Sequence, residues 1–282
     1  MKIEYKGKSL DFDQPKIMGI LNVTPDSFSD GGRYVNVESA LAHAREMFLA
    51  GASIIDVGGE STRPGAAPVS EEEELHRVIP VVESLAKDMN VWISVDTSSP
   101  AVMKAALEAG ASMINDVRAL RRPGAVQVVA EYKCPVCLQH MLGENPQDMQ
   151  DNPVYGDLIG DISSFLYERI DTCLNAGIKR DNIIIDPGFG FGKTLEQNYQ
   201  LLGQLERLGS FSLPILVGIS RKSMIGNLLK KPVEDRLVGS IAGNLYAVGK
   251  GANILRVHDV KDMSEALKVY MYASKFSKQK KK

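Results

Sequence analysis

The chain of 282 residues has 33 Lys and Arg against 35 Asp and Glu, which leaves a formal net charge of -2. This near balance argues against a nucleic-acid-binding surface and favours a small-molecule substrate. The first residues lack the apolar core of a signal peptide, and no stretch approaches the roughly 20 apolar residues of a membrane span. Three cysteines in a chain this long give no disulfide framework. We therefore expect a cytoplasmic protein that binds neither nucleic acid nor membrane.

Short apolar runs alternate with helical patterns along the chain. Strands are expected at Ile17 to Val23, Ser53 to Gly58, Val91 to Asp96, Ser112 to Val117, Pro135 to His140, Ile183 to Asp186, Ile215 to Ser220 and Asn253 to His258. Helices are expected at 37–50, 71–89, 99–109, 123–132, 156–176, 194–208, 234–249 and 261–275.

Eight such repeats predict an α/β fold, a (β/α)8 TIM barrel, in one domain over residues 1–282. Residues 1–15 are expected to be a lead-in, and 276–282 a frayed, lysine-rich tail. An open doubly wound sheet stays as an alternative, because periodicity cannot show that a sheet closes.

Polar residues gather where these strands end, which is where a TIM barrel places its active site. They are Asn22, Thr24 and Asp26; Glu60, Thr62 and Arg63; Asp96 and Thr97; Asn115 and Asp116; Gln139 and His140; Asp186; Ser220, Arg221, Lys222 and Ser223; and Arg256, His258 and Asp259. A purely structural barrel does not need so many polar groups at one end, although Asp116 and Asp259 also suit helix capping.

The segment from Ile54 to Gly65 passes directly from a buried strand to a polar loop. Gly58 and Gly59 allow a ligand to approach the backbone closely. Pro64 favours an extended backbone at Arg63, which projects the guanidinium away from the strand end. The loop is therefore suited to hold an anion, although an ordinary connection with a surface arginine fits the same residues.

The loops after the last two strands carry Ser220-Arg221-Lys222-Ser223 and Arg256-Val257-His258. Barrels often bind phosphate at these two loops, and Arg, Lys and His suit an anion. Separate surface salt bridges are the alternative. The segment lacks the glycine that precedes lysine in a P-loop. Gly188, Gly190 and Gly192 do not fit the dinucleotide-binding pattern either, and they predict a mobile loop that carries Phe189 and Phe191.

Metal and redox motifs are scarce. Cys134 and Cys137 have a C-x-x-C spacing, but on a strand their sulfurs point to opposite faces, so we expect both to be buried core. His43 and His76 lie in helical segments and are expected at the surface. Without a zinc motif, the metal expected is Mg2+ shared with substrate phosphates, and Asn22 is a candidate ligand.

Several longer motifs resemble one family. The segments 18–32 (MGILNVTPDSFSDGG) and 55–65 (IDVGGESTRPG) resemble the two signature segments of dihydropteroate synthases. The segments 93–97 (ISVDT), 114–116 (IND), 186–193 (DPGFGFGK), 220–226 (SRKSMIG) and 256–259 (RVHD) follow in the order of that family. The resemblance covers nearly the whole chain.

The resemblance implies a pterin-binding barrel that joins 6-hydroxymethyl-7,8-dihydropterin diphosphate to 4-aminobenzoate in folate biosynthesis. It also implies Mg2+ as cofactor, a homodimer, and a protein of the class that sulfonamides target. The residues that it assigns to the pterin are Asp96, Asn115, Asp186, Lys222 and Arg256, with Thr62 also touching substrate. Those that it assigns to the diphosphate and metal are Arg63, His258 and Asn22, and those around the aminobenzoate are Phe28, Pro64, Gly190, Phe191 and Ser223.

The expected mechanism is an SN1-like route through a pterin cation. Catalytic roles fall to Asp96, Asp186, Arg63, Lys222 and His258: the carboxylates stabilise the cation and the basic groups stabilise the leaving diphosphate. The aromatic amine is neutral near pH 7, so no general base is assigned. Loops 22–36 and 61–70 are expected to order the amine and exclude water. Arg63→Ala should severely slow turnover while pterin binding largely persists.

Two departures from the family pattern are Gln139, where a Met is common, and Asn244-Leu245-Tyr246 on a late helix. Three other functions were considered. A pterin-binding methyltransferase does not need the Ser61 to Pro64 loop, and a Schiff-base aldolase would use Lys222. A degenerate pterin-binding paralogue should lack the loop residues that this chain has. No role is assigned to Glu60.

Overall fold

A computed structural model describes residues 1–23, 33–60, 69–143 and 153–277, with the backbone alone for 33–36. The strands are β1 (Lys2–Tyr5), β2 (Lys8–Asp11), β3 (Lys16–Asn22), β4 (Ile54–Gly58), β5 (Trp92–Asp96), β6 (Met113–Asp116), β7 (Val136–Gln139), β8 (Ile183–Asp186), β9 (Leu216–Val217) and β10 (Ile254–Val257). The helices are α1 (Arg33–Leu49), α2 (Glu71–Asp88), α3 (Pro100–Glu108), α4 (Ala125–Tyr132), α5 (Leu158–Asn175), α6 (Leu195–Gly203), α7 (Ser223–Leu229), α8 (Leu237–Gly249) and α9 (Val260–Ser277). Short 3-10 helices cover Arg180–Asn182, Leu205–Phe211 and Val233–Asp235.

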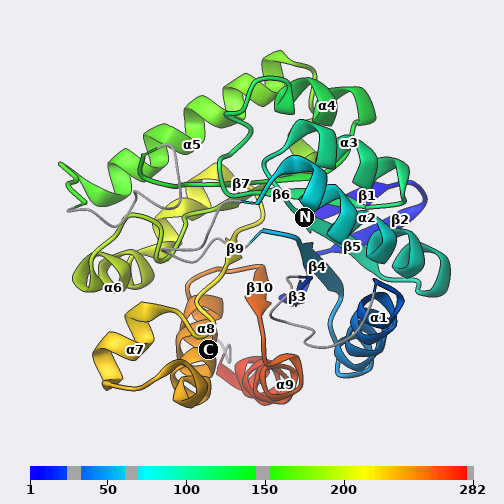
Figure 1. Cartoon of the computed structure of the whole chain (residues 1–282). Helices are drawn as coiled ribbons and strands as arrows, with labels where there is room; N and C mark the ends of the chain where they lie inside the picture. Colours follow the sequence, from blue (N-terminus) through cyan, green and yellow to red (C-terminus); the bar gives the residue numbers. More distant parts are fainter. Residues whose placement is uncertain (24–32, 61–68, 144–152, 278–282) are drawn as a thin grey trace.

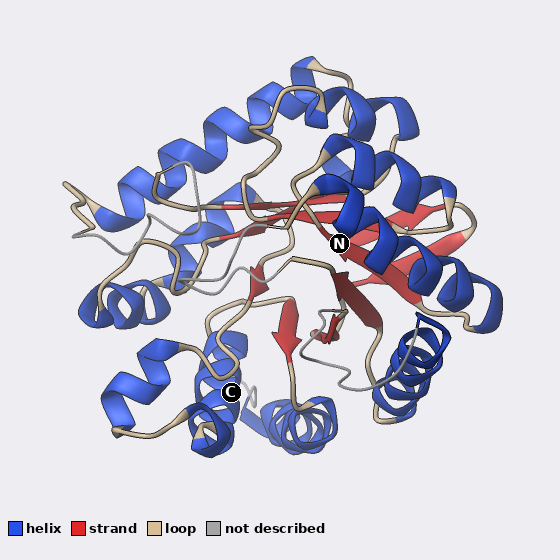
Figure 2. Ribbon diagram, in the orientation of Figure 1, coloured by secondary structure: helices blue, strands red, loops and turns tan. Residues whose placement is uncertain are grey.

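Eight parallel strands form the barrel, in the order β8-β7-β6-β5-β4-β3-β10-β9. A parallel bridge between Ile185 and Ile215 joins the two ends of this sheet. The helices surround the strands, as Figures 1 and 2 show. The prediction of a (β/α)8 barrel is confirmed, and closure rules out the open-sheet alternative.

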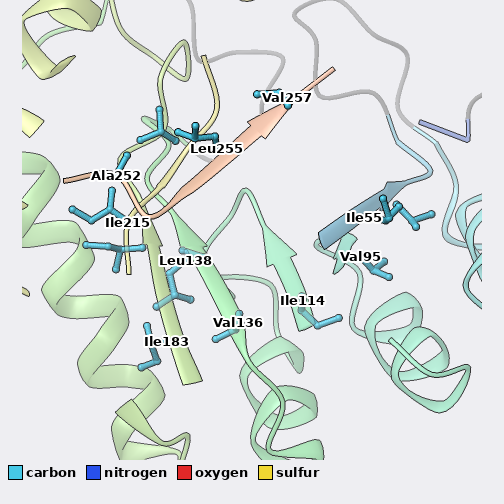
Figure 3. Packing of buried hydrophobic residues seen from close by; sticks show 14 of the residues in the cluster. Ile55, Val95, Ile114, Val136, Leu138, Ile183, Ile215, Ala252, Leu255 and Val257 are labelled. Atoms are coloured by element: carbon cyan, nitrogen blue, oxygen red, sulfur yellow. The ribbon is translucent and has the colours of Figure 1, made fainter. Parts of the chain in front are cut away.

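The larger core lies between the strands and the surrounding helices. Figure 3 shows part of it, with Ile55, Val95, Ile114 and Val136 on neighbouring strands. These residues alternate along each strand with others that face the barrel interior, because successive strand side chains point to opposite faces. Burial on both faces explains why the strands read as continuous apolar runs.

The N-terminal end of the barrel interior holds a second, separate core. Its members are Met18, Ile54, Trp92, Met113, Cys137, Ile184, Leu216 and Ile254 from the eight strands, with Ile3, Leu10 and Phe12 from the N-terminal segment. The antiparallel pair β1–β2 supplies Ile3 and Leu10, Phe12 follows directly after β2, and together they close this end of the barrel. The hairpin lies within residues 1–15, for which the sequence predicts only a lead-in.

The predicted elements also differ from the observed ones nearer the C-terminus. The strand expected at 215–220 is reduced to Leu216–Val217, because the chain turns at Arg221, which has φ of 57°. Helix α7 was not predicted, and the helix expected at 194–208 divides into α6 and a 3-10 helix. Helix α9 continues to Ser277, so the predicted tail is helical at 276–277 and otherwise lies outside the described residues.

The cysteines behave as the strand pattern predicted. Cys134 belongs to the core between strands and helices, whereas Cys137 belongs to the core inside the barrel. All three cysteines are buried and free. In the described part of the chain, no helix has the length and apolar character needed to cross a membrane.

Candidate active site

A layer of polar side chains lies inside the barrel, two positions after the apolar layer on six of the eight strands. Its members are Asp56, Ser94, Asn115, Gln139, Asp186 and Arg256. Five of them are buried, and Arg256 is partly buried. Because residues two apart on a strand face the same side, these side chains point into the barrel at its C-terminal end. This is the end at which TIM barrels bind substrates.

Arg256 is the centre of an ion-pair network in this layer. Its Nε donates to Asp56 Oδ2 at 2.6 Å, and its Nη2 donates to Asp96 Oδ2 at 2.7 Å. Asn115 Nδ2 also donates to Asp56 Oδ2, at 3.2 Å. Burial lowers the pKa of Arg256, but Asp56 and Asp96 more than offset this and raise it. The guanidinium thus stays charged and fixes two carboxylates from neighbouring strands.

Asp56 is the member of this network that the sequence reading missed. It stands inside an apolar strand, is fully buried, and receives hydrogen bonds from two of the predicted site residues. The available signal was its charge: a carboxylate within Ile54–Gly58 must be paired to be buried. Asp56 lies inside β4, whereas the predicted site residues lie at strand ends and in the loops after them.

Asp186 and Lys222 are a second set of neighbouring, oppositely charged side chains in the site. Burial raises the pKa of Asp186, while the nearby Lys222 and the amide of Gly188, which donates to Oδ1 at 2.7 Å, oppose this shift. Burial lowers the pKa of Lys222 to about 8, although Asp186 acts in the opposite direction. Lys222 Nζ donates to the carbonyl of Phe189 and lies 4.5 Å from the centre of the Phe191 ring.

The loops after β9 and β10, which are predicted to bind an anion, are in contact with each other. Ser220 Oγ and His258 Nδ1 are 3.1 Å apart, and the His258 amide donates to Ser220 Oγ at 3.2 Å. Arg221, by contrast, donates to both carboxylate oxygens of Asp259, at 2.9 and 2.5 Å. His258 is therefore positioned beside the barrel mouth, whereas Arg221 ties the two loops together.

The remaining predicted residues differ in how they are placed. Asn22 ends β3 partly buried, and its Oδ1 lies 3.8 Å from where a Cβ on Gly58 would stand. Ser223 is exposed at the start of α7, and Gly190 and Phe191 lie in the loop that contacts Lys222. The residues predicted to border the substrates at Phe28, Thr62, Arg63 and Pro64 lie outside the described residues, as does most of both predicted substrate loops.

Asp116 has a structural role. Its carboxylate accepts from Ser98 Oγ at 2.5 Å and from the amides of Arg118 and Leu120 at 2.8 and 2.7 Å. These bonds hold a turn in which Ala119 and Leu120 have positive φ. Asp116 therefore supports the turn directly after β6 and does not cap the later helix α4.

Four polar atoms of the inner layer have no hydrogen-bond partner among the described residues. They are Asp56 Oδ1, Ser94 Oγ, Asn115 Oδ1 and Gln139 Nε2. Buried polar atoms without partners are costly, so such a group of donors and acceptors indicates a site for a polar ligand. A ligand with several hydrogen-bonding groups satisfies this requirement better than an apolar ligand does.

Comparison with known proteins agrees with this geometry. A family model described as pterin binding enzyme matches residues 18–258. The dihydropteroate synthase of Escherichia coli K12 is 54% identical over 269 residues, 95% of each chain. That of Haemophilus influenzae is 52% identical over 270 residues, covering 96% of this chain and 98% of its own.

Solved structures give the same result. A Yersinia pestis dihydropteroate synthase in a sulfonamide drug complex superimposes with a TM-score of 0.93 and 53% identity, covering 98% of this chain and all of the other. A Xanthomonas albilineans dihydropteroate synthase in complex with 7,8-dihydropteroate has a TM-score of 0.88 and 45% identity, with coverage of 97% and 99%.

The barrel and its polar inner layer thus define a pterin binding enzyme, since the family model spans most of the chain. Within that class, the chain belongs to the dihydropteroate synthase family, which are transferases of folate biosynthesis. The resemblance read from the sequence motifs is confirmed.

Proposed function

We propose that this enzyme joins 6-hydroxymethyl-7,8-dihydropterin diphosphate to 4-aminobenzoate, with release of diphosphate. The observation that carries the proposal is the set of unpartnered polar atoms inside the barrel mouth, next to the Arg256 ion pairs. A pterin ring has adjacent donors and acceptors along one edge, and it needs a buried, mixed polar surface of this kind.

Binding of the pterin is assigned to the inner layer. Asp186 is a suitable acceptor for the amino group and ring N–H, and Asn115 provides both a donor and an acceptor. Lys222, whose ammonium lies over the Phe191 ring, is assigned to the oxygen-bearing side of the pterin ring. Asp96 lies one layer nearer the mouth, where its pairing with Arg256 holds a carboxylate close to the exocyclic carbon.

Binding of the diphosphate is assigned to His258 and Arg63, with Asn22 as the protein ligand of a Mg2+ ion. Among the described residues no cluster of three His, Cys, Asp or Glu can hold a metal. One side-chain amide oxygen fits Mg2+, because this ion keeps several waters and is often shared with substrate phosphates. When bound, the ion supplies positive charge that stabilises the leaving group.

The reaction is proposed to be SN1-like. Breaking the bond to diphosphate leaves positive charge on the pterin, and the carboxylates of Asp96 and Asp186 lie inside the barrel where they stabilise it. The neutral amino group of 4-aminobenzoate then attacks the exocyclic carbon and loses its proton. Phe191, Ser223, Gly190, Phe28 and Pro64 are assigned to the border of this second site.

One assay tests the proposed reaction. Diphosphate release is measured with pterin diphosphate alone, with 4-aminobenzoate alone, and with both. We expect release only with both substrates, together with formation of 7,8-dihydropteroate. Release without the amine would indicate a hydrolase, and absence of release in all three mixtures would support a pterin-binding module without transferase activity.

We also propose that the enzyme is a homodimer. Helices α8 and α9 pack side by side, and they carry five large exposed apolar side chains: Val238, Tyr246, Val269, Tyr272 and Phe276. Exposed apolar groups gathered on adjacent helices are typical of a protein interface. In sedimentation velocity, Val238→Glu should produce monomers, whereas Val154→Glu at an equally exposed site should not. A monomeric wild-type enzyme contradicts the proposal.

Two further properties are proposed. Sulfonamides should compete with 4-aminobenzoate, because both are para-substituted anilines; inhibition that added 4-aminobenzoate does not relieve contradicts this. The enzyme should reside in the cytoplasm, where its three buried cysteines stay reduced. Cell fractionation tests this location, and recovery with membranes or in the periplasm contradicts it.

A further inference from the structure

The loop between β8 and α6, Gly188–Gly192, adopts a backbone that requires glycine. Gly188, Gly190 and Gly192 have φ of 71°, 79° and 67°. A Cβ on Gly188 would lie 1.9 Å from the His140 carbonyl oxygen, so the loop is packed against the end of β7 without space for a side chain. Glycine therefore serves here to build a fixed shape, not only to permit motion.

Lys193, the residue that follows this loop, is buried and binds the loop from behind. Its Nζ donates to the carbonyl oxygens of Gly188 at 2.8 Å and Phe191 at 3.2 Å. The third contact is His140 Nδ1, at 3.1 Å. Three acceptors match the three N–H donors of an ammonium group. Burial strongly lowers the pKa of His140, so its neutral ring offers Nδ1 as an acceptor.

Two other side chains hold the same loop. Tyr155 Oη donates to the Gly192 carbonyl at 2.7 Å, and the Gly190 amide donates to Asn198 Oδ1 at 2.7 Å. Asn198 is itself buried and donates to the carbonyls of Lys193 and Thr194, at 3.1 and 2.7 Å. These contacts argue against the mobile loop that the glycine spacing predicted.

The front of the loop meets the active site. The Phe189 carbonyl accepts from Lys222, the Phe191 ring lies under the same ammonium, and the Gly188 amide donates to Asp186. Each contact involves a group assigned to substrate binding. A shift of the loop therefore moves Lys222, Phe191 and a hydrogen bond to Asp186 together.

We propose that Lys193 is a positioning residue for the transferase reaction: its ammonium, seated on His140, fixes the Gly188–Gly192 loop and through it Lys222 and Phe191. This inference rests on the function proposed above. Lys193 does not reach substrate, because its three donors are turned to the back of the loop. Its effect should fall mainly on the second substrate, since Phe191 borders the assigned aminobenzoate site.

Burial lowers the pKa of Lys193 to about 7, so its ammonium is present below that pH, where its charge also acts on Asp186. Burial raises the pKa of Asp186, and Lys222, Lys193 and Arg256 each oppose this. The Cys137 thiol, another titratable group inside the barrel beside Asp56 and Asp96, stays protonated because burial holds its pKa well above the usual value. Removal of the Lys193 charge should therefore raise the pKa of Asp186, so that pterin binding is lost at a higher pH on acidification.

The test compares Lys193→Met, which keeps most of the apolar stem, with two other variants. Lys104→Met, at an exposed position of α3, is the matched lysine control. Tyr155→Phe removes one hydrogen bond to the loop without changing charge. Steady-state kinetics, pterin diphosphate affinity between pH 5 and 8 and thermal unfolding are measured for each. Turnover of the wild-type enzyme is measured first, so that a failure of the proposed reaction is distinguished from a failure of the inference about Lys193.

For Lys193→Met we expect KM for 4-aminobenzoate to rise roughly 10- to 100-fold, the size expected when a reacting group is misplaced by about 1 Å. The affinity for pterin diphosphate at pH 8 should change less. The pH below which pterin diphosphate binding is lost should move to a higher value. Tyr155→Phe should raise the amine KM by a smaller factor without moving that pH, and Lys104→Met should match the wild type.

The inference is overturned if Lys193→Met keeps the wild-type KM for the amine. It is also overturned if the only change is a fall in apparent kcat that matches the loss of folded protein, or if the pH below which pterin binding is lost does not move. If Lys193→Met does not fold, the KM for the amine is compared between His140→Asn and His140→Leu instead. Asn keeps an acceptor for Lys193 and should keep the amine KM, whereas Leu should raise it roughly fivefold, as for one lost hydrogen bond. Equal KM values in this pair overturn the proposal.

Discussion

The two layers of side chains inside the barrel differ sharply although the same strands supply both. The lower layer is apolar, forms one core cluster, and is closed by the β1–β2 hairpin. The upper layer begins two residues later on each strand, roughly 7 Å away, and contains paired charges and unpartnered polar atoms. A strand can thus contribute to stability at one inward position and to ligand binding at the next.

The largest effect is expected from breaking the ion-pair network of the upper layer. Arg256→Met leaves Asp56 and Asp96 without their cation inside the barrel. The free energy of unfolding should fall by about 3–5 kcal/mol, and turnover should be lost. Arg45→Met removes an exposed pair with Asp88 and should cost at most about 1 kcal/mol. Urea denaturation of both variants checks this; equal losses would contradict the central role of Arg256.

Two substitutions on one strand separate the layers directly. Ile184→Ala, in the lower layer, should reduce the free energy of unfolding by about 2–5 kcal/mol and leave kinetics of the folded enzyme nearly unchanged. Asp186→Asn, in the upper layer, should lower kcat by about 10²- to 10³-fold with little loss of stability. The result that contradicts the comparison is an activity loss in Ile184→Ala as large as that in Asp186→Asn.

The upper layer should also respond to pH. Burial lowers the pKa of Lys222 to about 8 in the folded enzyme, so its ammonium is present below this pH and lost above it. Turnover limited by Lys222 should therefore decline as pH rises through about 8. In Lys222→Arg the guanidinium does not titrate, and whatever activity remains should lack this decline. A decline at the same pH in both enzymes assigns the titration to another group.

The smallest effect is expected at the cysteine of the lower layer. Cys137 is fully buried and its pKa is held well above the usual value by burial, so no thiolate is available. A thiol reagent should leave Cys137 unmodified in the native enzyme at pH 8 and react with it only after denaturation, as mass spectrometry of the digested protein can show. Rapid modification of Cys137 in the native enzyme would mean that the closed end of the barrel opens readily.

The sequence determined the parts of this structure that depend on neighbouring residues. The apolar run Ile183 to Asp186 predicted its strand and ended it at a carboxylate of the site. The helical pattern at 71–89 predicted α2, which begins directly after Ser70, where the Glu73 amide donates to Ser70 Oγ at 3.2 Å. Such features follow from alternation, helical periodicity and capping, which act over a few residues.

Only the tertiary structure decided which inward positions meet. Asp56 and Arg256 are 200 residues apart, yet their hydrogen bond organises the site, and the bridge between Ile185 and Ile215 closes the barrel. Lys193 reads from sequence as the end of a glycine-rich loop, but its contact with His140 turns that loop into a fixed support. These pairings depend on strand register and barrel closure, which bring together side chains whose local sequences contain no information about each other.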